Sequence, residues 1–271
     1  MTDCCAAPGL LPFNDALSLL LNNVTPTTKT LTLNIEQAFN YVLAQTIKSP
    51  MPIPPHDNSA MDGYAFALAS FEQSKTLKLA GKVLAGAPFQ GHCQPGECIR
   101  IMTGGKLPSG CDTVEMQENC TVNRVHDHDV ITFLSPKKLG QNVRKAGEDI
   151  AKGATVLTRG QRLTAVDIAL LASLGLSSVE VYQPIKVALI ATGDELKSPG
   201  QPLEEGDIYE SNRYFLSGIL KKLNAEIIDF GVIEDDFNAI KTAFIQADKQ
   251  ADVVISSGGV KQTLLKTYLI A

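Results

Sequence analysis

The last third of this 271-residue chain alternates between apolar runs and helix-like repeats. Runs suited to buried strands span 186–191, 226–233 and 252–256, and helical patterns at 212–223 and 235–247 separate them. Strands that alternate with helices in this way pair in parallel through right-handed crossovers. We therefore predict an open parallel α/β sheet, whose ligands would bind beyond the carboxyl ends of its strands.

The middle of the chain has a different texture. Between Pro50 and Pro55 four of the six residues are proline, which favours a stiff, extended segment. Short runs rich in Val, Ile, Leu and Thr follow at 77–84, 98–103 and 130–134, and Gly, Pro, Asn and Asp separate them. These runs predict a separate β-rich domain.

Apolar periodicity also predicts three further helices. Residues 14–23 and the segment from Asn34 repeat apolar side chains at helical spacing, and each segment begins with an asparagine suited to cap it. The second helix is expected to stop before Pro50, because the residue before a proline disfavours the α conformation. The third helix begins at Thr164, which has the spacing of a capping box with Asp167, and it stops at Gly175.

The composition excludes several classes of protein. Hydrophobic residues make up 44% of the chain and charged residues 20%. No apolar run approaches the ~20 residues of a membrane-spanning helix. The 24 basic and 29 acidic side chains leave a net charge of −5, without the basic character that nucleic acid requires. We expect neither a membrane nor a nucleic acid as partner.

Cysteine usage fits a chain that stays in the cytoplasm. The N-terminus lacks the pattern of a secretory signal, and thiols stay reduced in the cytosol. A metal site is the alternative; it would use His92, Cys93 and Cys98, or His126 and His128. These spacings match no common zinc pattern, so we interpret the six cysteines as buried or surface thiols.

Polar segments follow each predicted strand of the parallel sheet. They are Ala-Thr-Gly-Asp-Glu at 191–195, Glu-Asp-Asp at 234–236 and Ser-Ser-Gly-Gly at 256–259. The glycines let backbone N–H groups approach an anion, and a bridging Mg²⁺ would reconcile the acidic residues with a phosphate. Alternatively, residues 234–236 only cap the next helix, and Ser-Ser-Gly-Gly is a generic turn. The absence of a G-x-G-x-x-G or Walker A motif disfavours dinucleotide and P-loop enzymes.

The most distinctive segment is Asp-Asn-Ser-Ala-Met-Asp-Gly-Tyr-Ala at 57–65, directly after the prolines. Its four short polar side chains exceed what an ordinary Asx turn requires. A glycine at position 63 permits a tight turn before the next strand. We interpret the segment as part of a functional site.

Five motifs, taken together, resemble the molybdopterin molybdotransferases, the family that includes the gephyrin E domain. They occur in order between about Leu11 and Val260, as residues 57–65, Arg-Ile-Met-Thr-Gly at 100–104, Arg144 with Gly-Glu-Asp at 147–149, Thr-Gly-Asp-Glu at 192–195 and Val-Val-Ile-Ser-Ser-Gly-Gly-Val at 253–260. The resemblance implies a Mg²⁺-dependent reaction in which adenylylated molybdopterin and molybdate give molybdenum cofactor and AMP. It also implies a homodimer, an upstream molybdopterin adenylyltransferase and molybdoenzyme acceptors.

The resemblance also assigns site residues by position. The residues expected to be catalytic are Asp62, Thr103, Asp149, Glu195 and Asp235. Those expected to bind the pterin nucleotide are Arg144, Thr192, Ser257, Gly258 and Gly259. We expect Glu195 and Asp235 to organise Mg²⁺ and the phosphates. The residues before 150, Arg144 among them, would reach across the dimer toward the pterin or its phosphate.

The same resemblance predicts a mixed multidomain fold of α/β and β type. Its parts are a linking domain at 29–50 with 151–184, a β-rich domain at 51–150, and an incomplete doubly wound parallel α/β domain at 12–28 with 185–260.

Residues 261–271 diverge from the family, which continues with further strands and helices, so we expect a C-terminally truncated chain. The alternative function is therefore a non-catalytic family member that only dimerises or weakly binds the pterin nucleotide. Glu115 also departs from the family, because relatives usually have an apolar residue there. We expect it to lie on an exposed strand face or to cost stability.

Overall fold

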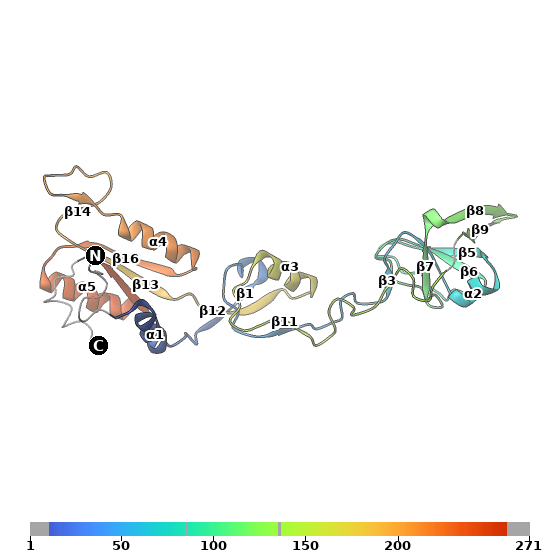
Figure 1. The fold of residues 1–271 in the computed structure, drawn as a ribbon, viewed down its shortest axis with the longest axis horizontal. Helices are drawn as coiled ribbons and strands as arrows, with labels where there is room; N and C mark the ends of the chain where they lie inside the picture. Colours follow the sequence, from blue (N-terminus) through green and yellow to red (C-terminus); the bar gives the residue numbers. More distant parts are fainter. Residues whose placement is uncertain (1–10, 85, 135–136, 259–271) are drawn as a thin grey trace, which may run out of the picture. The chain divides into compact units, whose positions relative to one another are not determined.

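The computed structural model describes residues 11–84, 86–134 and 137–258. Two compact units divide the chain, and each is described by itself. The α/β unit comprises the described parts of Met1–Gln45, Arg159–Ala169 and Ser177–Ala271, and the β-rich unit comprises those of Thr46–Thr158 and Leu170–Leu176 (Figure 1). The division into three domains stays a prediction. No helix in the described ranges is long and apolar enough to cross a membrane.

The α/β unit contains the predicted parallel sheet. Its central strand β13 (Lys186–Thr192) lies between β16 (Glu226–Ile233) and β17 (Val253–Ser257), and both neighbours run parallel to it. Helices α4 (Asn212–Lys222) and α5 (Phe237–Gln250) make the crossovers. The order of strands and helices read from the sequence is confirmed.

Strand β13 is buried on both faces, which explains its unbroken apolar run. Successive side chains of a strand point to opposite faces. Accordingly Ala188 and Ile190 pack against α5, whereas Val187 and Leu189 pack against α4. Figure 1 shows the two helices on opposite sides of the sheet. The result is a three-layer, doubly wound arrangement of three strands.

A second, antiparallel pair in the same unit joins distant parts of the chain. Strand β1 (Thr30–Asn34) pairs with β12 (Ser178–Tyr182).

Helix α3 (Ala165–Ser173) begins with the predicted capping box. The backbone N–H and the hydroxyl of Thr164 both donate to Oδ2 of Asp167, over 2.8 and 2.6 Å.

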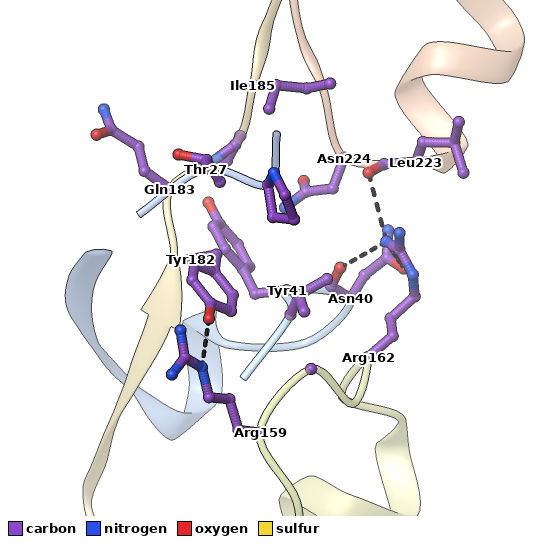
Figure 2. Close-up of a pocket in the computed structure, with 14 residues that line it drawn as sticks. Thr27, Asn40, Tyr41, Arg159, Arg162, Tyr182, Gln183, Ile185, Leu223 and Asn224 are labelled. Atoms are coloured by element: carbon purple, nitrogen blue, oxygen red, sulfur yellow. Dashed lines mark hydrogen bonds between the residues drawn. The ribbon is translucent and has the colours of Figure 1, made fainter. Parts of the chain in front are cut away.

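The helix predicted to run from Asn34 to a stop before Pro50 is wrong. Only one 3-10 turn forms, η2 (Ile35–Gln37), and Asn34 makes no side-chain cap. Asn40 then adopts a left-handed φ of 67°, and the fully buried Leu43 forms a β-bridge to β12. Ala38 and Leu43 are buried, but Phe39 is 59% exposed, so the apolar residues do not share one helical face. The N–H groups of Asn40 and Leu43 donate to the carbonyls of Leu163 and Gln161, far along the chain. This segment lines a pocket described below (Figure 2).

Two helices begin at other residues than predicted. Helix α1 (Phe13–Asn23) follows Pro12 rather than Asn14, and no side chain caps it. Proline suits a helix start because its ring fixes φ and its missing N–H would have no intrahelical partner there. Helix α5 begins after Asp236, whose carboxylate accepts the Ala239 N–H over 2.9 Å. The alternative interpretation of residue 236 as a helix cap is confirmed.

The β-rich unit is built on a six-stranded mixed sheet in the order β7-β4-β6-β5-β9-β8. Its strands are β4 (Gly63–Phe66), β5 (Thr76–Val83), β6 (Glu97–Ile101), β7 (Thr113–Met116), β8 (Cys120–Val125) and β9 (His128–Phe133). Only β5 and β6 pair in parallel. A short helix, α2 (Leu68–Gln73), follows β4. The strand runs predicted for this region are confirmed.

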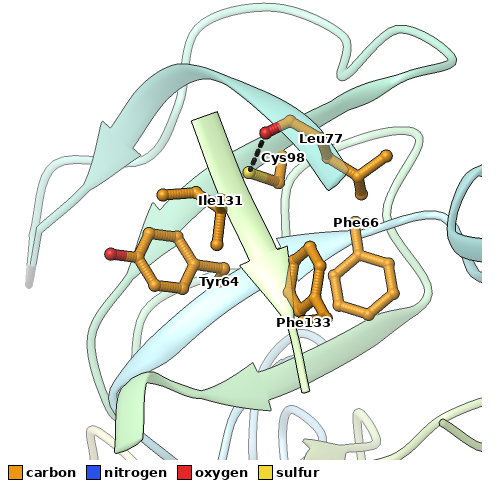
Figure 3. Close-up of a cluster of buried hydrophobic side chains, with 6 residues drawn as sticks. All are labelled: Tyr64, Phe66, Leu77, Cys98, Ile131 and Phe133. Carbon is orange, nitrogen blue, oxygen red and sulfur yellow. Dashed lines mark hydrogen bonds between the residues drawn. The ribbon is translucent and has the colours of Figure 1, made fainter. Parts of the chain in front are cut away.

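The core of this sheet is aromatic (Figure 3). Phe66 and Phe133 are buried with their ring centroids 4.5 Å apart, and Tyr64 meets Phe133 edge to face. Leu77 of β5, Cys98 of β6 and Ile131 of β9 complete the cluster. Leu77 and Leu79 of β5 face this cluster, two positions apart as strand geometry requires, whereas Val83 lies beyond a register shift and packs in a second cluster.

Short strands and one further turn complete the described chain. In the β-rich unit, β2 (Ile47–Lys48) pairs with β11 (Thr155–Leu157) and β3 (Asn58–Ser59) with β10 (Val143–Arg144), and a 3-10 turn, η3 (Gln117–Asn119), follows β7. In the α/β unit, β14 (Leu196–Lys197) pairs with β15 (Ile208–Tyr209).

Glu115 on β7 does not lie on an exposed strand face, so that expectation is wrong. Its side chain is buried and forms an ion pair with Lys137, which is buried as well. The amides of Asn119 and Gln141 also donate to the carboxylate, over 2.8 and 3.0 Å. Burial raises the pKa of Glu115, but the hydrogen bonds from Lys137 and Asn119 bring it below its ordinary value. The charge is therefore compensated where it lies.

Candidate functional site

Three segments of the β-rich unit converge around the distinctive 57–65 sequence. Strands β3 and β10 place residues 58–59 beside 143–144. The Ser59 N–H donates to the Gly105 carbonyl over 3.0 Å, which adds the loop after β6. The predicted residues Asp62, Thr103, Arg144 and Asp149 all lie on these segments.

Asp62 and Thr103 are in direct contact. Oδ1 of Asp62 accepts both the N–H and the hydroxyl of Thr103, each over 2.7 Å. These two hydrogen bonds lower the pKa of Asp62 below its ordinary value. The carboxylate is therefore ionised and fixed in orientation, although it is partly open to solvent.

Arg144 is bound by two carboxylates. Its Nε donates to Glu148 over 2.6 Å, and its Nη2 donates to both oxygens of Asp149 over 2.9 and 2.7 Å. These bonds raise the pKa of Arg144 and lower that of Glu148. A pterin or phosphate at Arg144 would have to compete with these two carboxylates.

Two ion-pairing residues of this cluster were missed by sequence reasoning. Lys145 donates to Oδ2 of Asp57 over 2.9 Å, and the Ala146 N–H donates to Oδ1 over 2.8 Å. Both bonds lower the pKa of Asp57. The Lys145 N–H also donates to the carboxylate of Glu148 over 2.8 Å, which stabilises the turn at 145–148. Only the position of Lys145 and Glu148 beside assigned residues could have signalled them.

The second group of predicted residues lies at the carboxyl ends of the α/β sheet. Thr192 ends β13, and Gly258 follows β17. Gly258 has a φ of +97°, and a Cβ there would lie 2.2 Å from the Thr192 carbonyl oxygen. Only glycine fits this close approach of two backbones.

Glu195 and Asp235 lie on neighbouring loops of this edge. The Asp235 N–H donates to Oδ1 of Asp194 over 3.0 Å and so links the two loops. Sequence reasoning did not assign Asp194 a role, although it stands inside the Thr-Gly-Asp-Glu motif. Gly193, at φ +148°, leaves room for the Glu195 carboxylate, which lies 2.8 Å from where a Cβ would be.

The carboxylates of Glu195 and Asp235 differ from those of the β-rich unit. Both residues are exposed, and within the described ranges neither carboxylate has a hydrogen bond or an ion pair. Ser257 is half-buried at the end of β17. Gly259 lies outside the described residues.

The chemistry of these donors bears on a metal. In the part of the chain that the structure describes, no three His, Cys, Asp or Glu side chains are grouped to hold an ion. Mg²⁺ typically takes one or two carboxylates together with substrate phosphates. Glu195 and Asp235 therefore fit a magnesium ion that arrives with a phosphorylated substrate, and they do not form a complete metal cage.

The four cysteines in the described residues are free thiols, two buried and two half-buried, as predicted. Burial raises the pKa of Cys98, and it raises that of Cys120 to about 11. High pKa values suppress the reactive thiolate. Cys4 and Cys5 lie outside the described residues.

Comparison with known proteins identifies the family. The model of the MoeA N-terminal region (domain I and II) matches residues 11–175, and that of a probable molybdopterin binding domain matches 188–263. The chain belongs to the MoeA family. Its relatives in Haemophilus influenzae and Nostoc carry the name molybdopterin molybdenumtransferase.

Individual relatives agree with this assignment. The molybdopterin molybdenumtransferase of Haemophilus influenzae is 45% identical over 251 residues, which cover 93% of this chain and 61% of the relative. That of a Nostoc species is 38% identical over 224 residues, 81% of this chain and 50% of the relative. The crystal structure of the MoeA protein from Pyrococcus horikoshii OT3 matches with a TM-score of 0.85 and 35% identity, over 93% of this chain and 67% of that one. The chain thus spans about three-fifths of the length of the Haemophilus relative.

Proposed function

We propose that this chain takes part in inserting molybdate into adenylylated molybdopterin, with release of AMP. The observation that carries the proposal is the edge of the α/β sheet. There, the glycine backbone at Gly258 meets Thr192 beside the open carboxylates of Glu195 and Asp235. This combination offers backbone donors for an anion and oxygen ligands for a cation. The names of the relatives support the same chemistry.

Glu195 and Asp235 would hold Mg²⁺ together with the phosphates of the substrate. The ion would neutralise the negative charge that builds up when AMP leaves. Asp194 would keep the two loops in register through its bond to the Asp235 N–H. Thr192 and the Ser257-Gly258-Gly259 segment would bind the pterin nucleotide.

The β-rich unit would supply the other half of the site from a second copy of the chain. Asp62 and Thr103, already joined, would present a fixed carboxylate to the pterin or its phosphate. To bind the ligand, Arg144 would release its hydrogen bonds to Asp149 or Glu148 and donate to the ligand instead. The proposal therefore includes a homodimer in the cytoplasm, supplied by a molybdopterin adenylyltransferase and delivering to molybdoenzymes.

The alternative is a non-catalytic family member that only dimerises or weakly binds the pterin nucleotide. Its structural support is that Arg144 is already bound by the carboxylates of Glu148 and Asp149. Binding without turnover distinguishes this role from the first.

The test uses the purified 271-residue chain with adenylylated molybdopterin, molybdate and Mg²⁺. We expect AMP release that depends on Mg²⁺ and slows at least ~10-fold in Glu195→Gln, since even outer-shell metal partners contribute ~10–100-fold. Glu205→Gln, an exposed residue of the same unit with the same charge change, is the matched control. Binding without AMP release by the wild-type chain would favour the second function. An unchanged rate in Glu195→Gln would remove the assignment of that residue to the metal.

A further inference from the structure

The α/β unit contains a second feature away from the strand ends, a pocket of about 680 Å³. This volume lies within the ~300–1,000 Å³ of small-molecule sites. Side chains from separate parts of the chain surround it, as Figure 2 shows. They include Asn40, Tyr41, Arg159, Arg162, Tyr182 and Asn224. None of the residues proposed above for molybdate insertion lines it.

The charge of the pocket is one-sided. Two arginines line it and no aspartate or glutamate does, although the whole chain has a net charge of −5. Arginine in a concave site without a carboxylate attracts anions, because the low-dielectric walls concentrate the field. The pocket is therefore locally positive on an otherwise acidic chain.

Arg162 uses only one end of its guanidinium. Its Nη1 donates to the backbone and side-chain oxygens of Asn40, over 3.0 and 3.2 Å, and to the Leu223 carbonyl over 3.3 Å. All three acceptors are uncharged. Among the described residues, Nε and Nη2 bond to nothing and no carboxylate pairs with the group. Arginine has five N–H donors in a fixed fork, so a two-pronged donor set is left for a carboxylate or phosphate.

Part of this arrangement has a purely structural explanation. Helix α4 ends beside Arg162, and Asn40 donates to the Lys222 carbonyl over 3.2 Å. A cation at a helix C-terminus stabilises the exposed carbonyls. Capping accounts for Nη1, but it leaves the Nε and Nη2 donors and the unneutralised charge without a role.

Flat surfaces complete the pocket. Tyr41 and Tyr182 line it and are half-buried, with Ile185 close by. Arg159 donates from Nε to the Tyr182 hydroxyl over 2.5 Å and lies 5.6 Å from the centre of that ring. These contacts hold the ring in place. Aromatic rings and guanidinium planes are the groups on which a planar ligand stacks.

We propose that this pocket binds a small anion that carries a planar aromatic ring, of the size of a mononucleotide. Its anionic group accepts the free donors of Arg162, and its ring lies against Tyr41 and Tyr182. Asn224 lines the pocket with a side-chain amide able to hydrogen-bond the ring edge. This site does not depend on the function proposed above.

The test measures binding of three probes to the full chain by calorimetry and by NMR of the tyrosine rings. The probes are AMP, inorganic phosphate and adenosine, which carry both features, the anion alone and the ring alone. We expect AMP to bind more tightly than either and to shift the ring signals of Tyr41 and Tyr182. Because AMP is also a product of the proposed reaction, the ring signals separate this pocket from the strand ends.

Two variants test the charge. Arg162→Gln should weaken AMP binding by ~10-fold or more, the scale of a charge-assisted pair. Gln183→Glu should weaken it too, because this nearly isosteric change adds a negative charge at the pocket without touching the α4 cap. Arg124→Gln, an exposed arginine of the β-rich unit, is the matched control.

The proposal is overturned if AMP leaves both tyrosine signals unmoved, or if both pocket variants bind AMP like the wild type. Phosphate binding as tightly as AMP would overturn the role of the ring. Adenosine binding as tightly as AMP would overturn the role of the anion.

Discussion

The two groups of candidate residues differ in how their carboxylates are held. In the β-rich unit, Asp57, Asp62 and Asp149 each accept hydrogen bonds from neighbouring residues. In the α/β unit, Glu195 and Asp235 are exposed, and their carboxylates have no hydrogen-bond or ion-pair partner among the described residues. The first group is oriented by bonds within the chain. The second keeps its negative charge available, as expected where a cation and a phosphate arrive together.

The two units also fix the geometry of their candidate sites in different ways. The β-rich unit holds its candidate carboxylates with local hydrogen bonds, and the buried Glu115 with an ion pair as well. The α/β unit fixes geometry with the backbone instead, through Gly258 and Thr192. The following changes test each half of this contrast, beginning with the largest expected effect.

Lys137→Met is the most severe test of the held carboxylates. It leaves Glu115 buried without its cation, which we expect to lower the free energy of unfolding by about 3–5 kcal/mol. Urea unfolding measures the loss. Lys138→Met changes the exposed neighbour and should have little effect. The double variant Glu115→Gln with Lys137→Met should regain part of the loss. If the Lys137→Met chain were as stable as the wild type, the claim that Lys137 compensates the buried charge of Glu115 would be wrong.

The same pair predicts a pH dependence. The pKa of Glu115 is lower in the folded chain than its ordinary value, so the stability it contributes is present above that value. This contribution should be lost as the pH falls through the lowered pKa. Urea midpoints measured from neutral to acid pH should therefore converge for the wild type and Glu115→Gln. Parallel curves would contradict the assignment.

Gly258→Ala tests the backbone-held side. A Cβ at this position meets the Thr192 carbonyl at 2.2 Å, and the φ of +97° is strained for alanine. We expect a loss of about 1–3 kcal/mol in thermal unfolding. Gly218→Ala in α4 is the control, because a Cβ there meets nothing within 4 Å. It should stabilise the helix by about 0.5–1 kcal/mol. Equal effects of the two changes would show that the approach is not tight.

The neighbouring residues Asp235 and Asp236 allow a carboxylate without a hydrogen-bond partner to be compared with one that caps a helix. Asp236→Ala removes the cap of α5 and should cost about 1 kcal/mol. Asp235→Ala removes a side chain without a described partner and should change the stability by less than about 0.5 kcal/mol. Thermal unfolding of both variants measures the difference. A larger loss for Asp235 would mean that its carboxylate is held after all.

The smallest effect concerns a single titration. Thr103→Val removes one of two hydrogen bonds to Asp62 and should raise the pKa of Asp62 toward its ordinary value, without unfolding. Carbon-13 NMR of the carboxyl group measures the change. Thr121→Val, on the exposed strand β8, should leave that titration where it is. An unshifted pKa in Thr103→Val would show that the hydroxyl does not fix this carboxylate.

Sequence patterns predicted the elements whose signal is local. The buried run of β13 and the capping box at Thr164 each specify their structure within a few residues. The prediction of a helix from Asn34 failed because contacts with distant parts of the chain determine the structure there. Leu43, for example, forms a β-bridge to β12. Helical spacing alone cannot tell these two sources of burial apart.

The sites divide in the same way. Resemblance placed Asp62 and Thr103 at one site, and their contact agrees with it, whereas their role stays a prediction. It could not show that Arg144 is already bound by Glu148 and Asp149. The Arg162 pocket was missed altogether, because no spacing connects Asn40 with Leu223 until the chain has folded.

The antiparallel pair β1–β12 has a consequence for synthesis. The hydroxyl of Thr30 donates to Glu180 over 2.7 Å, and the two residues are 150 positions apart. During translation, β1 leaves the ribosome long before its partner exists, while the six-stranded sheet between them can already close. We therefore expect a late folding step in which β1 pairs with β12 after the six-stranded sheet has formed. Until then, its unpaired edge is a natural target for chaperones.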